Sequence, residues 1–143
     1  MVPPMSEERY SRVVHPLHAV FLAGTLPLFL GALLSDAAYA TSHEIQWNNF
    51  ASWLIAGGLV FAGIALVFAI VDLCRPRRRA PGILPYGAIL LVLWVVGFLN
   101  ALVHARDAWA SMPTGLVLSV IVAVLACAAT WLGFCTPRIG GMK

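Results

Sequence analysis

Long apolar runs separated by short polar segments dominate this chain. Four of the runs are each long enough to cross a bilayer, because about 20 apolar residues span the hydrocarbon region. They lie at about 17–37, 50–72, 83–104 and 115–135. A backbone inside lipid must satisfy its own hydrogen bonds, so each run is expected to be a helix. Short connections favour an all-α, up-down-up-down four-helix bundle, a single integral membrane domain over residues 1–143.

The composition supports a lipid environment. Of 143 residues, 61% are hydrophobic and only 10% are charged, whereas soluble domains have about 25% charged residues. Ala38-Tyr39-Ala40 resembles a signal-peptide cleavage site. However, the apolar run before it is long, and His18 and Pro27 interrupt it. We therefore expect the first run to be retained as a span.

The positive charges predict an orientation. The net charge is +3, and four arginines lie in one short loop, at Arg75, Arg77, Arg78 and Arg79. By the positive-inside rule, this loop and both termini face the cytoplasm, and the segments 38–48 and 105–114 face the other side. Orientation and lipid contact explain the arginines, so no nucleic-acid partner is expected.

Helix alternation sorts the polar residues between the two ends of the bundle. One end receives His15, His18, Asp72 and the arginines. The other receives Asp36, His43, Glu44, Asn100, His104, Arg106 and Asp107. Helical spacing also puts several residues of the first span on one face, which is polar at both ends and is expected to point inward. These residues are His15, His18, Leu22, Thr25, Phe29 and Asp36.

The four histidines are candidate ligands of haem iron. His15 and His18 are three residues apart on one helix and cannot bracket the same iron; they can serve two irons, or one ligates while the other holds a propionate or backbone group. His43 and His104 come from different segments of the same end and can bracket one haem. Arg106 is then placed to pair with a propionate. Asn100 shares a helical face with His104.

Other interpretations of these residues stay open. His15, His18 and Asp72 form a set suited to zinc or another divalent ion, to proton handling or to a quinone headgroup. More simply, His15-Pro16 opens a helix, and Asp72 pairs with an arginine. The three cysteines form no CxxC pair, so neither a disulfide framework nor a thiolate metal site is expected. A nucleophile–base pair and a phosphate-binding loop are also missing from the sequence.

Three motifs resemble a bacterial inner-membrane family with four spans, catalogued as domain-of-unknown-function family 2231. They are the opening His15-Pro16-Leu17-His18, the segment from Gly57-Gly58 to Asp72, and the run from Asn100 to Trp109, which resembles a subgroup with a His-x-Arg-Asp-Ala-aromatic signature. The resemblance covers about residues 13–135. Many family members carry a further histidine where this chain has Gly24.

The subgroup resemblance implies an electron-transfer setting beside periplasmic quinoprotein dehydrogenases. The leading expectation is therefore a small membrane haem b protein, a homodimer, that passes electrons from a periplasmic donor (a dehydrogenase or a cytochrome) to the quinone pool. Its role is electron transfer rather than stand-alone catalysis. The expected ligands, in order, are His104, His18, His43 and His15. The alternatives are a metal-binding or proton-handling membrane protein and a cofactor-free anchor subunit.

Overall fold

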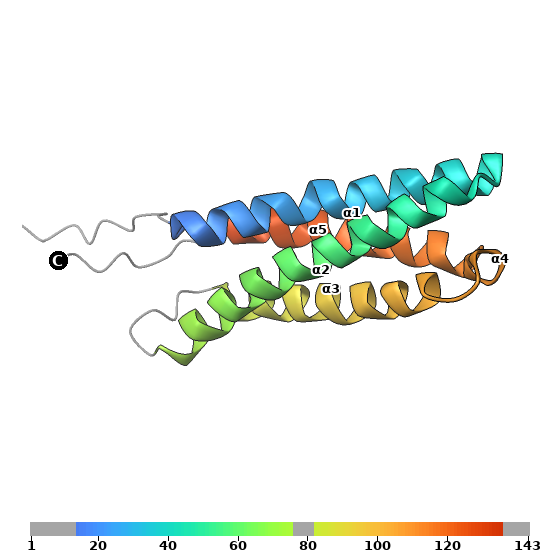
Figure 1. The fold of residues 1–143 in the computed structure, drawn as a ribbon. Coiled ribbons are helices and arrows are strands. Elements are labelled where there is room, and N and C mark those ends of the chain that lie inside the picture. Colours follow the sequence, from blue (N-terminus) through green and yellow to red (C-terminus); the bar gives the residue numbers. More distant parts are fainter. Residues whose placement is uncertain (1–13, 76–81, 136–143) are drawn as a thin grey trace, which may run out of the picture.

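A computed structural model describes residues 14–75 and 82–135. Its elements are α1 (Pro16–Ser42), α2 (Ile45–Cys74), α3 (Ile83–His104), the short α4 (Ala108–Ser111) and α5 (Thr114–Cys135). Among the described residues, the four long helices are each apolar and long enough to cross a membrane. The predicted all-α membrane bundle is confirmed (Figure 1).

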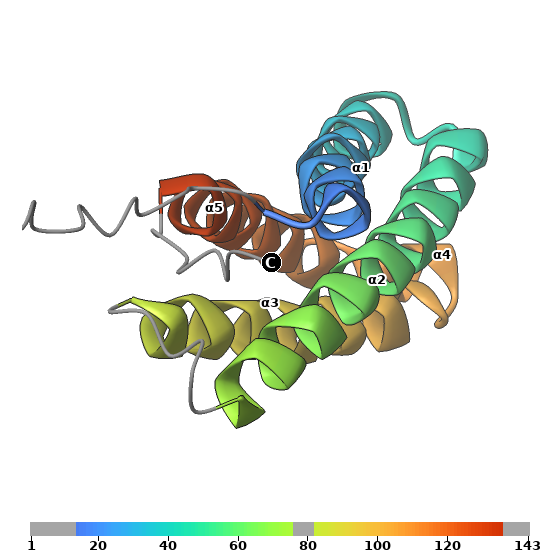
Figure 2. The same ribbon diagram turned by 90° about the vertical axis from the view of Figure 1, so that its left-hand side faces the viewer.

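The four long helices alternate in direction along the bundle (Figure 1). Helix α1 packs against α2 and α5, and α3 packs against the same two helices. Helices α1 and α3 therefore run parallel on one diagonal of the bundle, with α2 and α5 on the other (Figure 2). This is the expected up-down-up-down topology.

Two helices extend beyond the predicted spans. The expected connection at 38–48 shrinks to His43 and Glu44, because α1 continues to Ser42 and α2 begins at Ile45. With 27 residues, α1 is about 40 Å long and passes beyond the hydrocarbon region. It ends at His43, whose left-handed backbone (φ 56°) lets its N–H donate to the carbonyl of Tyr39 at 2.8 Å. As expected, Pro16 opens the helix.

Buried positions recur in steps of three and four residues on each membrane helix. On α3 they are Ile83, Tyr86, Leu90, Leu93, Gly97, Asn100 and His104. The same spacing continues on α1, α2 and α5. This repeat is typical of left-handed bundles with interlocking side chains. The inward face predicted for α1 is confirmed, except at His15, which is exposed.

Large core residues lie mainly on one diagonal and small ones on the other. Helices α1 and α3 contribute Leu22, Phe29, Tyr86, Leu90 and Leu93. Helices α2 and α5 contribute mostly alanine and glycine. A methyl group built on Gly58 would lie 2.8 Å from the Phe29 ring, and one on Gly133 would lie 2.8 Å from the Tyr86 ring. The small residues therefore make room for the large ones, as expected where lipid offers no hydrophobic drive between helices.

Candidate functional site

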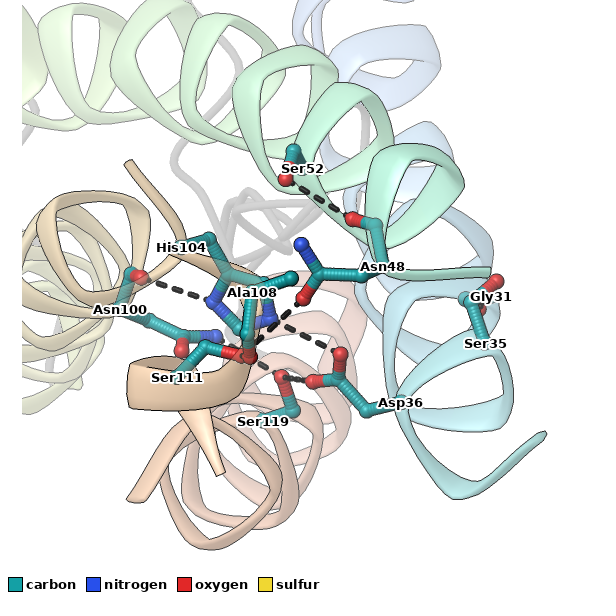
Figure 3. Close-up of polar contacts among 10 residues, drawn as sticks. All are labelled: Gly31, Ser35, Asp36, Asn48, Ser52, Asn100, His104, Ala108, Ser111 and Ser119. Atoms are coloured by element: carbon teal, nitrogen blue, oxygen red, sulfur yellow. Dashed lines mark hydrogen bonds and ion pairs between the residues drawn. The ribbon is translucent and has the colours of Figure 1, made fainter. Parts of the chain in front are cut away.

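A buried polar cluster joins α1, α3 and α5 at the end of the bundle near the α1–α2 connection (Figure 3). Asp36 of α1 is 0% exposed, although it is an aspartate in a membrane helix. Its Oδ1 lies 2.8 Å from Nε2 of His104, the last residue of α3. Its Oδ2 accepts a hydrogen bond of 2.5 Å from the hydroxyl of Ser119 on α5. One carboxyl group thus connects three helices.

Asn100 closes these contacts into a ring. Its side-chain Nδ2 donates to Ser119 Oγ at 2.8 Å. Its backbone carbonyl lies 3.0 Å from Nδ1 of His104. Hydrogen bonds therefore run through Asn100, Ser119, Asp36 and His104 and return to Asn100 (Figure 3). We call these four residues the polar ring.

The hydrogen bonds fix how many protons the Asp36–His104 pair holds. A backbone carbonyl oxygen only accepts, so His104 Nδ1 must carry a hydrogen. One further hydrogen fits between Nε2 and Asp36 Oδ1. The pair is then either carboxylate with imidazolium or carboxylic acid with imidazole, and its net charge is zero in both forms. With both contacts of His104 as hydrogen bonds, the two residues share one acidic proton.

A second hydrogen bond bridges α1 and α3 at the opposite end. His18 Nε2 lies 2.7 Å from the Tyr86 hydroxyl, and both side chains are fully buried. The ring of Phe68 on α2 stacks on His18, with centroids 5.3 Å apart. Asp36 follows His18 by 18 residues, and His104 follows Tyr86 by the same interval. Eighteen residues make five helical turns, or about 27 Å, so the two bridges share one face of each helix.

An open pocket connects the polar ring with the aqueous end of the bundle. Its volume is about 460 Å³, and His104 forms part of its lining. Further lining residues are Gln46, Asn48, Ser52, Arg106 and Asp107. Ser111 of α4 donates to Asn48 Oδ1 at 3.1 Å and so ties α4 to α2 beside this pocket. Hence the buried pair lies beside an open pocket through His104.

The other predicted histidines occupy different surroundings. His43 is exposed and belongs to a second pocket of about 300 Å³. Its ring centroid is 5.9 Å from that of Trp109, and the same pocket contains Tyr39. His15 is exposed beside Phe68, with ring centroids 5.8 Å apart.

The structure brings some predicted site residues together and separates others. Asn100 and His104 share the polar ring, and Arg106 lies in the pocket beside it. His43 and His104 belong to different pockets. Asp72 is half-buried at the far end. Within residues 14–75 and 82–135, no group of three histidine, cysteine, aspartate or glutamate side chains is placed to hold a metal ion.

The described side chains do not fit a haem between His43 and His104 in one chain. Both ring nitrogens of His104 are engaged in this conformation, with Asp36 and with the Asn100 carbonyl. Phe29 packs so closely on Gly58 and Gly97 that the bundle core is filled at that level. His104 is thus placed for acid–base chemistry with Asp36.

Sequence reasoning did not single out Asp36, Ser119 and Tyr86 as site residues. Asp36 was assigned to the inward face of the first span and to the same end as His104, and both assignments are confirmed. The equal spacing from His18 to Asp36 and from Tyr86 to His104 was the available signal. It becomes meaningful once α1 and α3 are known to run parallel.

The fold and the polar ring define a small integral membrane protein with a buried acid–base pair. Residues 14–136 match the model of a family described as predicted membrane proteins, DUF2231, and the chain belongs to that family. This confirms the predicted resemblance at family level. Neither a curated protein nor a solved structure shows a significant match to the chain.

Proposed function

We propose that this protein binds and releases a proton at the Asp36–His104 pair, in exchange with water at one end of the bundle. The observation that carries the proposal is a fully buried carboxyl group whose Oδ1 lies 2.8 Å from an imidazole nitrogen. Ionisable groups inside a membrane are rare and often form proton relays, because burying them is costly. Histidine is suited to this role, since its charge changes in the physiological pH range.

A purely structural role explains the pair less well. Neutral hydrogen bonds suffice to hold helices together, as Ser111 and Asn48 do in the same region. An asparagine in place of Asp36 would still accept a hydrogen bond from one of its two partners, Ser119 and His104, and donate to the other, without the cost of an ionisable group in the membrane. The aspartate adds an acid, and His104 adds a base that reaches the open pocket.

The open pocket beside His104 offers a route between the pair and water. The core between the two polar bridges contains Leu22, Phe29, Leu90 and Leu93. The hydroxyl of Thr25 also lies there, but it donates to the carbonyl of Phe21 one turn earlier. A proton therefore enters and leaves through the pocket beside His104. Its gain or loss alters the bond that joins α1 to α3.

This proposal places proton handling at the opposite end from the predicted His15, His18 and Asp72 set. With the arginine-rich segment in the cytoplasm of a bacterial inner membrane, the polar ring opens to the periplasmic side. Haem b, a quinone, a periplasmic dehydrogenase and a homodimer remain predictions. An absorption spectrum of the purified protein tests the first, since bound haem gives a Soret band that a haem-free protein lacks.

Infrared difference spectroscopy of the protein in lipid nanodiscs tests the proposal. Spectra between about pH 4 and pH 9 should contain one carboxyl band that titrates together with an imidazole band. Asp36→Asn should remove the carboxyl band and alter the imidazole band. Glu44→Gln is the matched control, because Glu44 is an exposed carboxylate near the same end.

The control variant should keep both bands of the buried pair. If the wild-type protein contains no coupled carboxyl and imidazole bands over this range, the pair does not exchange its proton. The polar ring would then be a structural bridge only.

A further inference from the structure

The side-chain amide of Asn100 points to a second occupant of the polar ring. Asn100 is 0% exposed, and its Nδ2 donates to Ser119. Its Oδ1, however, is buried and has no hydrogen-bond partner among the residues that the structure describes. An unpaired buried carbonyl oxygen costs free energy of folding. Its presence in an otherwise closed ring therefore indicates a ligand that this oxygen can bind.

The polar ring contains several oxygen atoms that can coordinate a metal ion. Asp36 offers two carboxyl oxygens, Ser119 a hydroxyl, and Asn100 its amide oxygen and its backbone carbonyl. Oxygen donors of this kind suit hard cations such as those of the alkali and alkaline-earth metals. All three cysteines are exposed. The donor set therefore disfavours a soft metal.

His104 controls access to these oxygens. Its ring lies between Asp36 Oδ1 and the Asn100 carbonyl, and it also lines the open pocket. If the ring turns into the pocket, both oxygens become available. Besides His104, the charged or titratable groups that line this pocket are Arg106 and Asp107, whereas α2 contributes the uncharged Asn48 and Ser52. The α5 residue that contacts Asp36 is Ser119, which is also uncharged.

We infer that the polar ring binds a small monovalent cation, of which Na⁺ is the type, in competition with the shared proton. This inference rests on the proton exchange proposed above. The site supplies one negative charge, on Asp36, and one proton compensates it. A monovalent cation beside a neutral His104 leaves the same net charge. A divalent cation would leave an uncompensated positive charge in a dry environment, which is unfavourable.

The exchange balances in charge and atoms. The hydrogen between His104 Nε2 and Asp36 Oδ1 leaves as a proton to water in the pocket. The cation leaves its hydration shell in part and takes Asp36, Ser119 and Asn100 oxygens as ligands. One cation enters for each proton released, and no other reactant is needed.

Proton release on addition of NaCl tests the inference. The wild-type protein in weakly buffered nanodiscs is mixed with NaCl or, at the same ionic strength, with choline chloride, and a pH indicator records the protons released. About one proton per chain is expected with NaCl and none with choline. The titration midpoint of the pair should fall by about one pH unit for each tenfold rise in Na⁺ above its dissociation constant.

Two variants distinguish cation binding in the polar ring from cation binding at the protein surface. Asp36→Asn should abolish the release caused by Na⁺, and Glu44→Gln should retain it. Release that persists in Asp36→Asn would show surface binding and overturn the inference. A wild-type pair that titrates identically in both salts would also overturn it, while the proposed proton binding would stand. If the pair titrates in neither salt, both the cation inference and the proposed proton binding are wrong.

Discussion

Gly115→Ala is the most informative perturbation of the packing around the polar ring. Gly115 lies in the first turn of α5, directly against the His104 ring. A methyl group there would lie 2.8 Å from His104 Cε1 and 3.3 Å from Nε2. Carbon atoms in ordinary contact are about 3.5 Å apart or more, so the ring would have to retreat by about 0.7 Å.

The displaced His104 side chain is held by hydrogen bonds on both sides of its ring. His104 bonds Asp36 at 2.8 Å and Asn100 at 3.0 Å. A retreat of about 0.7 Å would lengthen the Asp36 bond to about 3.5 Å or the Asn100 bond to about 3.7 Å, where little of a hydrogen bond remains. Overpacking costs about 1–3 kcal/mol, and the better helix propensity of alanine returns about 1 kcal/mol. The net loss of stability is about 0–2 kcal/mol.

Gly87→Ala provides the matched control. Gly87 is a helical glycine of α3, and a methyl group on it would contact nothing within 4 Å. This variant should therefore gain about 0.5–1 kcal/mol. Chemical unfolding in detergent micelles, followed by tryptophan fluorescence, compares the two variants with the wild type. A Gly115→Ala protein as stable as the Gly87→Ala protein would refute the close packing of α5 on His104.

Three further predictions concern the opposite end of the bundle and the orientation. Gly133→Ala should be less stable than Gly87→Ala by about 1–3 kcal/mol in the same unfolding assay, because both variants gain helix propensity but only the methyl group at position 133 would overlap Leu22 and Tyr86; equal stabilities would contradict it. Tyr86→Phe should cost about 0.5–2 kcal/mol through loss of the His18 hydrogen bond, and a more stable variant would argue against that bond. Cys74 and Cys135 are exposed at the C-terminal ends of α2 and α5. A membrane-impermeant maleimide should label them in inside-out vesicles and not in intact cells, and the reverse result would invert the orientation.

The bundle was predictable because lipid leaves the backbone few choices. Runs of apolar residues must be helical there, and short connections force antiparallel neighbours. The helix ends were less predictable. Ala37 to Ser42 follow a charged residue and could belong to a loop by composition, yet they extend α1 because nothing in that stretch breaks a helix.

The partners of the polar residues were much harder to predict. Helix alternation puts Asp36 and His104 at one end, but their bond depends on the rotation and axial position of α1 and α3. Those quantities follow from packing details such as the Phe29 ring against Gly58. A histidine in an apolar chain is consistent with iron, zinc or a carboxyl partner, and only its neighbours in space distinguish them. The predicted inward orientation of His15 was wrong, because His15 precedes the first turn of α1 and is exposed.

Nitrogen-15 NMR of the protein labelled at histidine, in lipid bilayers, tests the shared proton most directly. We expect that His104 Nδ1 stays protonated while its Nε2 resonance changes with pH, and that Asp36→Asn alters this Nε2 behaviour without affecting exposed His43. A His104 signal that follows pH exactly as His43 does, with or without Asp36, would contradict the account.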